Sequence, residues 1–332
     1  QNFTSATDSN NTAVGDKAGY AVTTGTNNTL VGTSAGDAMN TGTRNVAVGT
    51  GALGVHTSGT DNVAIGSVDA AAAEVLGSNL TGGGNIAIGG GTLANYTASN
   101  SLAVGYRALK ASTDGHTNIG IGNYAGDAIT TGDNNIMIGY DCGSYTTNFI
   151  TGGQNVCIGH YITAGGTADN YANALGYNLT AHGGYTTLGK GADDIRASHG
   201  STTWSTVSDE RYKKDIEDAK AGLSFINALK PRTFKYKTLG ELPETFRAYE
   251  ADSTKVFKNE NTNHGFIAQE VKQAIDADSD LKDGFRLWDE RGDGSQEIAE
   301  TALIPMLVKA IQELSAKNTA LEAKVTALEN AE

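Results

Sequence analysis

A serine and a lysine stand five residues apart at the point where the composition of the chain changes. Residues 208–213 read Ser-Asp-Glu-Arg-Tyr-Lys, between a glycine-rich region and a domain of ordinary composition. A serine hydroxyl needs a base to act as a nucleophile, and lysine is the base in the Ser-Lys variants of serine peptidases. The same residues suit the start of a helix, with Ser208 as N-cap and acidic residues in the first turn. The spacing alone leaves both readings open.

Three further motifs follow this segment in order. Residues 229–236 read Leu-Lys-Pro-Arg-Thr-Phe-Lys-Tyr, residues 264–271 read His-Gly-Phe-Ile-Ala-Gln-Glu-Val, and residues 303–314 run from Leu-Ile-Pro-Met into heptads. In this order and spacing, the four motifs resemble the intramolecular chaperone domains of phage tail fibres and tailspikes, a family of self-processing serine peptidases. The resemblance extends from Ser205 to the C-terminus. It is more specific than any single motif, and it favours self-cleavage over helix capping.

The resemblance implies one cut per chain, at the Val207–Ser208 bond. Ser208 would be the nucleophile and Lys213 the base, while Asp209 and Arg211 match positions that support the site. Lys213 must lose its proton to act as a base, which burial or a nearby positive charge would favour. On an ideal helix, residues five apart point about 140° away from each other. The segment must therefore bend, or a neighbouring subunit must complete the site after assembly.

A short motif recurs through the glycine-rich region, 1–190, which holds 35 of the 43 glycines. Its pattern is Asn, any residue, a small residue, an aliphatic residue and a glycine, which we name the closing glycine. Most neighbouring closing glycines are as far apart in the sequence as Gly15 and Gly32. We name this separation the repeat interval. Departures from it mark insertions such as residues 67–84. The full and degenerate copies end at Gly15, Gly32, Gly49, Gly66, Gly89, Gly105, Gly122, Gly139, Gly159, Gly176 and Gly189.

Each copy of the motif predicts one coil of a parallel β-solenoid or β-roll, with two short strands and two turns. The aliphatic residues share one face of a strand and the small residue points to the other, so both faces are expected to be buried. One coil cannot bury its own core, so the coils must stack. Strict aliphatic placement argues against the alternative of a flexible linker.

The repeats of residues 11–165 resemble the heads of trimeric autotransporter adhesins, in which three β-rolls pack about a threefold axis. Repeats in those heads are usually somewhat shorter than the repeat interval of this chain, which leaves the handedness and shape of the coil open. The resemblance implies a homotrimer.

The chain is expected to be mainly β, with a small α+β domain and a coiled coil at its C-terminal end. Within that domain we expect a helix over residues 208–229, strands over 233–236 and 265–267, and a helix over 267–275. Pro305 falls in the first turn of the last helix, where a missing N–H costs little. The expected segments are a β-roll shaft or head over residues 1–190, a connector over 191–207, the chaperone auto-processing domain over 208–300 and a coiled-coil helix over 301–332.

The heptads of the last helix bear on the number of chains. Branched residues at a, leucine at d and one asparagine at a favour a parallel dimer, whereas both resemblances favour a trimer. We expect the trimer, because the contacts within a large trimeric body would outweigh the preference of one short helix for a dimer. An amphipathic helix folded back on its own domain is the alternative. The a positions are Ile304, Ile311, Asn318 and Val325, and the d positions are Leu307, Leu314, Leu321 and Leu328.

Composition excludes several classes of function. The net charge of −13 argues against nucleic acid and anionic membranes as partners, and no apolar run is long enough to insert into a membrane. The six histidines show no ligand spacing and no phosphate loop is present, so we expect no metal and no cofactor. Cys142 and Cys157 are expected to be small apolar fillers. Because the chain begins with Gln1, we expect a piece of a longer protein.

The resemblance to phage chaperone domains implies a tail-fibre or tailspike tip protein of a phage virion, made in the host cytoplasm. Its β-roll would bind a host-surface receptor such as a glycan or an outer-membrane component, and upstream fibre or virion proteins would be further partners. Its only enzymatic activity would be a single-turnover self-cleavage. A bacterial trimeric surface adhesin without proteolysis is the alternative. A glycan-degrading tailspike would need an enzymatic domain upstream of Gln1.

Overall fold

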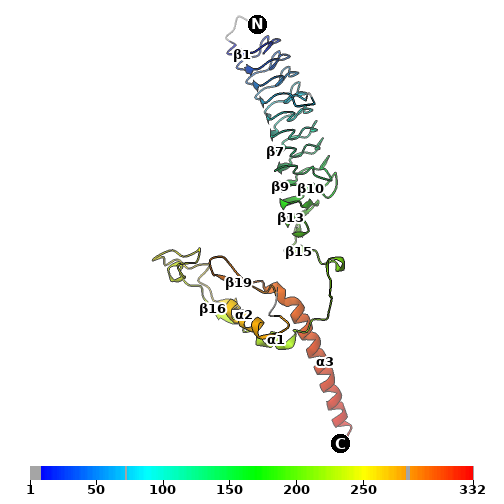
Figure 1. The fold of residues 1–332 in the computed structure, drawn as a ribbon, viewed down its shortest axis with the longest axis vertical. Helices are drawn as coiled ribbons and strands as arrows, with labels where there is room; N and C mark the ends of the chain where they lie inside the picture. Colours follow the sequence, from blue (N-terminus) through cyan, green and yellow to red (C-terminus); the bar gives the residue numbers. More distant parts are fainter. Residues whose placement is uncertain (1–8, 72, 282–284, 332) are drawn as a thin grey trace. The chain divides into compact units, whose positions relative to one another are not determined.

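A computed structural model describes residues 9–71, 73–281 and 285–331 of the chain. The chain divides into two compact units, Gln1–Tyr212 and Lys213–Glu332 (Figure 1). No helix within the described ranges is long and apolar enough to cross a membrane.

The first unit is a β-solenoid of stacked coils, which confirms the fold class predicted from the repeats (Figure 1). Strands of successive coils pair in parallel, so that each repeat position lies beside its counterpart in the next coil, as Ala47 lies beside Ala64. The parallel strands are β1 Thr12–Val14, β2 Thr29–Val31, β3 Val46–Val48, β4 Val63–Ile65, β5 Ile86–Ile88, β6 Leu102–Val104, β7 Ile119–Ile121, β8 Ile136–Ile138, β9 Val156–His160, β11 Asn173–Tyr177 and β13 Tyr185–Lys190.

Two antiparallel strands follow β13 at the C-terminal end of this sheet. Strand β14 (Asp193–Ser198) pairs with β13, and β15 (Ser205–Thr206) pairs with β14. A second, two-stranded sheet joins β10 (Thr163–Ala164) to β12 (Thr180–Ala181).

The prediction of a second strand in every coil is wrong for most coils. Residues 33–36 and 123–126, for example, form turns. The backbone there is left-handed at the second and fourth residues after the closing glycine, with φ of 55° at Ser34 and 58° at Gly36. Left-handed residues interrupt an extended strand.

The closing glycines are required by the approach of the next coil. Their φ values lie in the left-handed half of the map, 126° at Gly49 for example, where other residues are strained. A Cβ atom on Gly49 would lie 1.8 Å from the carbonyl oxygen of Gly66. The stacking of the coils therefore fixes the residue type at this position.

In several coils, two positions of the repeat share one volume in the solenoid core, so that a small residue at one position is matched by a large residue at the other. The middle residue of each three-residue strand points inward, and in the coils of Ala47 and Ala103 a buried leucine lies six residues further along, Leu53 and Leu109. In the coil where the middle residue is Leu30, the corresponding position is Gly36. A Cβ atom on Gly36 would lie only 2.9 Å from the Cδ2 atom of Leu30, so the two positions share one volume.

A column of asparagines, buried in every coil but the first, joins the coils. Asn45 Oδ1 accepts a hydrogen bond from the backbone N–H of Asn62 at 3.0 Å, and Asn45 Nδ2 donates to the carbonyl of Gly59 at 2.9 Å. Equivalent bonds join most of the other coils and satisfy backbone groups that would otherwise be buried without partners. The column is formed by Asn11, Asn28, Asn45, Asn62, Asn85, Asn118, Asn135 and Asn155.

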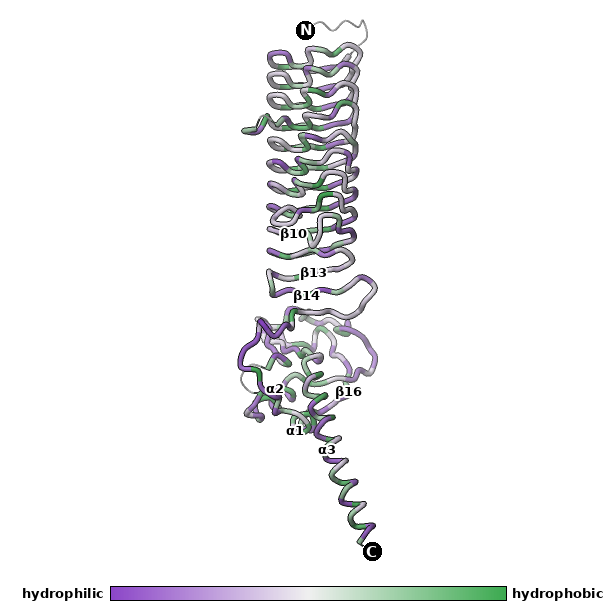
Figure 2. The backbone as a smooth tube through the Cα atoms, turned by 90° about the vertical axis from the view of Figure 1, so that its right-hand side faces the viewer, coloured by the Kyte–Doolittle hydropathy of each residue, from purple (hydrophilic) through white to green (hydrophobic). Residues whose placement is uncertain are grey.

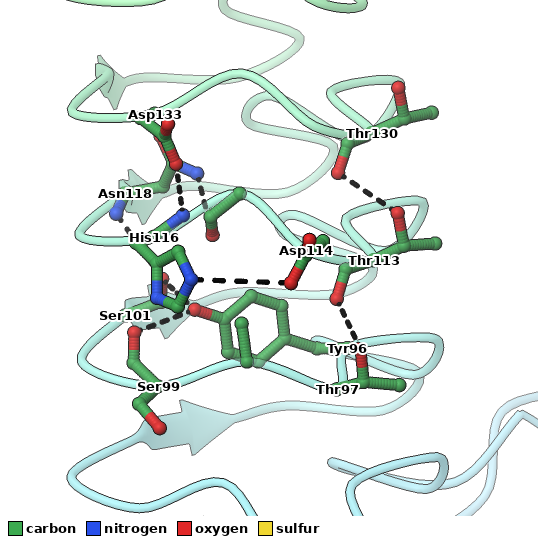
Figure 3. Close-up of polar contacts among 12 residues, drawn as sticks. Tyr96, Thr97, Ser99, Ser101, Thr113, Asp114, His116, Asn118, Thr130 and Asp133 are labelled. Atoms are coloured by element: carbon green, nitrogen blue, oxygen red, sulfur yellow. Dashed lines mark hydrogen bonds and ion pairs between the residues drawn. The ribbon is translucent and has the colours of Figure 1, made fainter.

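Ser101 interrupts this column, and a tyrosine fills the space of the missing amide (Figure 3). The Tyr96 hydroxyl lies 2.8 Å from Ser101 Oγ and donates to the Ser99 carbonyl at 2.8 Å. Outside the column, the Thr97 hydroxyl donates to the Thr113 carbonyl of the next coil at 2.8 Å.

The second unit is a small α+β domain. Its strands form two antiparallel pairs. Two of the predicted helices, α2 and α3, are confirmed, and strands form near both predicted positions, over residues 232–234 and 263–265. Its core contains Phe225, Val271, Ile275 and Leu287. The elements are α1 Leu223–Ala228, β16 Arg232–Phe234, the 3-10 turn η2 Leu239–Glu241, β17 Asn263–Gly265, α2 Ala268–Ala277, β18 Trp288–Glu290, β19 Gln296–Ile298, the 3-10 turn η3 Glu300–Leu303 and α3 Ile304–Glu329.

The prediction of one helix over residues 208–229 is wrong. Only a 3-10 turn, η1 (Glu210–Tyr212), and α1 form there, and residues 213–222 have no regular helix. Asp215 is left-handed, with φ of 53°, which ends helical geometry. Residues 213–220 are all exposed, so no apolar face is present to hold a helix against a core.

Candidate functional site at the junction

The expected cleavage bond lies just past the last strand of the solenoid sheet. Strand β15 ends at Thr206, whose hydroxyl donates to the Asp194 carbonyl at 3.1 Å. Val207 and Ser208 follow it and are exposed, 46% in the case of Val207. The bond thus lies in an accessible segment that is anchored on its N-terminal side.

Asp209 and Arg211 form one bidentate unit. Asp209 Oδ1 accepts hydrogen bonds from the backbone N–H of Arg211 at 2.8 Å and from its Nε at 2.9 Å, and Oδ2 accepts from Nη2 at 2.7 Å. The hydrogen bond to Asp209 raises the pKa of the Arg211 guanidinium above its ordinary value. The backbone N–H of Tyr212 donates to the Asp209 carbonyl at 3.1 Å, which closes the turn η1. Asp209 therefore organises the turn directly after Ser208.

The structure places the four expected site residues on both sides of a boundary. Ser208, Asp209 and Arg211 belong to the first unit, whereas Lys213 is the first residue of the second. Ser208 and Lys213 are both exposed. The pairing of these two side chains stays a prediction.

Large apolar side chains that neighbour the expected cleavage bond in the sequence are exposed, and none of them was expected to belong to the site. Trp204 is 47% exposed, Tyr212 71% and Ile216 64%. Apolar residues in a polar segment were the signal that could have indicated them. Exposed apolar side chains of this size can mark surfaces that are covered in an assembly.

The two motifs downstream of Ser208 meet in the second unit. Strands β16 and β17 place Thr233 opposite His264. Arg232 forms an ion pair with Glu270, with Nε 2.9 Å from Oε2. Two motifs that are well separated in the chain thus build one structural element. Within the described residues, no cluster of three or more His, Cys, Asp or Glu side chains could hold a metal ion.

Comparison with protein families identifies this region. Residues 208–279 match the peptidase S74 family, described as the chaperone of endosialidase. The resemblance to the phage tail-fibre and tailspike chaperones is therefore confirmed over this stretch, and the family implies self-cleaving peptidase activity in general. Neither the curated proteins nor the solved structures gave a match to the chain.

Proposed function

We propose that the protein is the tip of a phage tail fibre or tailspike, whose C-terminal chaperone cuts itself from the β-solenoid at the Val207–Ser208 bond. One coincidence carries the proposal. The family match begins at Ser208, and the last strand of the solenoid sheet ends at Thr206. A cut between Val207 and Ser208 would separate the complete sheet from the complete matched region.

The proposed chemistry uses the residues of the junction alone. Lys213 takes the proton of the Ser208 hydroxyl, and Oγ attacks the carbonyl carbon of Val207. The bond between this carbon and the Ser208 nitrogen breaks, the nitrogen takes the proton, and Val207 becomes an ester on Ser208 Oγ. Water then hydrolyses the ester and leaves a carboxylate on Val207 and a free hydroxyl on Ser208. The Asp209–Arg211 pair holds the turn on which Ser208 is presented.

The outer face of the solenoid sheet supports a parallel homotrimer. The first and third residues of each strand point away from the core, and from β3 to β9 these outer rows are Val, Ile or Leu. Figure 2 shows the hydrophobic positions recurring from coil to coil. None of these aliphatic residues is buried in the single chain, and Ile65, Ile86 and Ile158 are 37%, 39% and 38% exposed. A continuous aliphatic face of this length needs cover, which two further copies in register would supply.

The last helix supports the same assembly. Its heptad residues are exposed in the single chain, including Ile311 at 64%, Leu314 at 51% and Leu328 at 70%. Side chains at a and d positions bury themselves by packing against the same helix of another copy. The solenoid and the helix therefore present faces for the same partner, a second and third copy of the chain.

Assembly also offers a reason for the timing of the cut. In the single chain Ser208 and Lys213 are exposed, and the apolar side chains around them are exposed as well. A buried environment is what would let Lys213 act as a base. We infer that contact between copies covers the junction and turns the site on. The solenoid would then bind the host surface, as expected for a virion tail fibre.

Mass spectrometry of the purified protein tests the cut. Wild type should yield fragments 1–207 and 208–332, whereas Ser208→Ala and Lys213→Ala should each remain full length. Ser205→Ala is the matched control, because it lies in the same segment outside the motif and should cut normally. Efficient cutting of Ser208→Ala at the same bond would refute the mechanism. An uncut wild-type trimer would instead favour a permanent tip or a surface adhesin.

Light scattering on the uncut Ser208→Ala background tests the assembly. The expected mass is that of three chains. Leu314→Asp with Leu321→Asp should lower the mass, and the same pair of changes in the wild-type background should slow the cut. A monomer or dimer mass without these changes would contradict the trimer.

A further inference from the structure

Five tyrosines stack along one side of the solenoid, one in each of five successive coils. The centroids of neighbouring rings lie 5.5, 6.2, 5.4 and 5.8 Å apart, and neighbouring rings are nearly perpendicular, with interplanar angles between 80° and 87°. Edge-to-face contacts of this kind are favourable for aromatic pairs. The tyrosine row consists of Tyr106, Tyr124, Tyr140, Tyr161 and Tyr177.

The rings alternate between two positions of the repeat. Tyr106, Tyr140 and Tyr177 come one residue after a closing glycine, whereas Tyr124 and Tyr161 come two residues after it and are left-handed, with φ of 59° and 57°. Each coil therefore contributes one ring.

Polar side chains occupy the other position in each coil. We name the tyrosines and these polar residues the strip; within it, the Arg107 guanidinium lies over the Tyr106 ring, 5.1 Å from the ring centroid. The polar members are Arg107, Asn123, Asp141, His160 and Asn178, and Lys190 lies opposite Tyr177 in the last parallel pair.

Part of the strip is open to solvent. Tyr140 is 40% exposed and Tyr177 46%. The longer coil after Gly139 adds Tyr145, which is 46% exposed and lies 4.7 Å from Tyr161 between ring centroids. Three rings, those of Tyr140, Tyr145 and Tyr177, thus contact the ring of Tyr161. The strip follows the closing glycine of each coil, and in β9 and β11 the strand continues past that glycine to His160 and Tyr177.

Tyrosine at these positions is confined to the C-terminal half of the array. In the first five coils the residue after the closing glycine is small or acidic: Asp16, Thr33, Thr50, Ser67 and Gly90. Those coils stack through the same asparagine column and closing glycines. The stacking of coils therefore does not require the tyrosine row.

We propose that the tyrosine row binds a linear glycan that lies along the solenoid axis. Aromatic rings present apolar surface to the C–H groups of a sugar, and the polar members of the strip can hydrogen-bond its hydroxyls. Coils repeat at the strand spacing of ~4.8 Å, which is close to the length of one sugar unit in an extended chain. Each unit therefore meets one ring and one polar side chain.

The charges of the protein and of the strip favour a glycan over a nucleic acid as the bound polymer. Rows of aromatic rings also suit single-stranded nucleic acid. The net charge of −13 and the carboxylate of Asp141 within the strip disfavour a polyphosphate backbone. A glycan needs no such neutralisation. The inference rests on the proposed host-binding function and names the surface that performs it.

An array of purified bacterial O-polysaccharides and capsular polysaccharides is the probe. The trimeric wild type should bind at least one polysaccharide, and Tyr140→Ala with Tyr177→Ala should weaken that binding about tenfold or more. Tyr140→Phe with Tyr177→Phe keeps the rings and should lose less. Tyr20→Ala is the matched control, because Tyr20 is 72% exposed in the first coil, outside the strip.

Light scattering, thermal melting and self-cleavage are measured on the same samples. Unchanged mass and melting with weakened binding support the proposal. It is overturned if wild type binds none of the polysaccharides, if the alanine variant binds as wild type does, or if that variant loses its trimer mass, which would make the row an interface between copies. Normal cleavage together with absent polysaccharide binding overturns this site and leaves the proposed fibre function standing, whereas absent cleavage in wild type counts against that function.

Discussion

The Tyr96 hydroxyl lies 2.8 Å from Ser101 Oγ inside the solenoid, at the level where the coils on either side carry Asn85 and Asn118. Ser101 still accepts the backbone N–H of Asn118 at 3.2 Å, and its own N–H donates to Asn85 Oδ1 at 3.1 Å. Asn118 Nδ2 reaches the Gly115 carbonyl at 3.1 Å, in place of the contact that an asparagine at position 101 would have offered it (Figure 3). One coil thus keeps the hydrogen-bond column intact with a different set of atoms.

Removing the Tyr96 hydroxyl should show how much the stability of the solenoid depends on these hydrogen bonds. Tyr96→Phe removes the hydroxyl that donates to the Ser99 carbonyl and contacts Ser101 Oγ, and should cost about 1–3 kcal/mol. Tyr96→Met with Ser101→Asn brings in the residue types of Met39 and Asn45 and should recover most of that loss. Denaturant unfolding of Tyr96→Met, Ser101→Asn and the double variant measures the coupling. Simply additive losses would contradict the exchange of partners.

Adjacent glycines should respond in opposite ways to alanine. At Gly89, φ is 124° and a Cβ atom would lie 2.6 Å from the Gly105 carbonyl oxygen, so Gly89→Ala should separate two coils. At Gly90 the nearest atom would be 3.4 Å away, an ordinary contact, so Gly90→Ala should be almost neutral. Thermal melting and hydrogen exchange across β5 and β6 compare them. Equal stability of the two variants would show that the coils can move apart without loss.

The two thiols should be inert in the folded protein. Burial raises the pKa of Cys142 to about 12 and that of Cys157 well above its ordinary value. Cys142 Sγ donates a hydrogen bond to the Cys157 carbonyl at 3.2 Å. Because the thiolate is the reactive form, neither should react with a thiol reagent at neutral pH until the chain is unfolded, when both should. Rapid labelling of the native protein would contradict the assignment of both as core residues.

Acid should loosen the insertion between β4 and β5. Burial works to raise the pKa of Asp69, but hydrogen bonds from the Ala73 backbone, Arg107 and the Ala71 backbone outweigh it and hold the pKa below its ordinary value of 3.8. A carboxylate with a lowered folded pKa contributes stability above its unfolded pKa, and loses it as the pH falls through the folded one. Protection of residues 67–71 and 73–76 from hydrogen exchange should therefore decrease below about pH 4, and this dependence should vanish in Asp69→Asn.

A matched pair of arginine variants separates burial from charge. The Asp69 side chain is fully buried at its contact with Arg107, whereas Arg44 and Asp61 form an ion pair with 58% and 51% of their side chains exposed. Arg107→Ala should cost about 1–3 kcal/mol, because it leaves a buried carboxylate short of a partner. Arg44→Ala should leave the free energy of unfolding almost unchanged, because water already solvates both charges of the exposed pair. Equal costs would show that the insertion is not anchored by this contact.

The Asp209–Arg211 pair should affect the rate of the proposed cut without being its nucleophile or base. Asp209→Asn keeps an acceptor for the Arg211 backbone but loses the charged bidentate contact. The self-cleavage rate should fall about tenfold to a hundredfold, the cost of misplacing a reacting group. Asp218→Asn, an exposed acidic position in the same segment, should cut at the wild-type rate. Normal cutting by Asp209→Asn would remove Asp209 from the site.

Periodicity in the sequence was enough to predict the stack of coils, but not the surroundings of each face. The alternation of aliphatic and small residues indicates two faces, and both were expected to be buried. In the single chain only the small residues, such as Ala64 and Ala87, are enclosed, while the aliphatic Ile65 and Ile86 are partly exposed. The spacing of residues within one chain does not show which of its faces another chain covers.

Two features of the structure could not be predicted from the sequence, for geometric reasons. Asp209 and Arg211 are two residues apart, and on the helix expected there their side chains would point to different faces. The 3-10 turn brings them together. The tyrosine row has no fixed place in the repeat, because its rings alternate between two neighbouring positions. An alignment of coils shows each tyrosine as an irregularity, and only the stacking of coils joins them.

Each closing glycine faces the carbonyl of the next coil in the same way, so a coil presents equivalent surfaces above and below. Recombination that duplicates or deletes the stretch of gene for one coil would leave nearly every contact of the remaining coils in place. The reach of the array can therefore change by inheritance in steps of one strand spacing, ~4.8 Å. Natural variants of this protein should differ in length by whole coils, and such a lineage could adjust its reach without rebuilding either end.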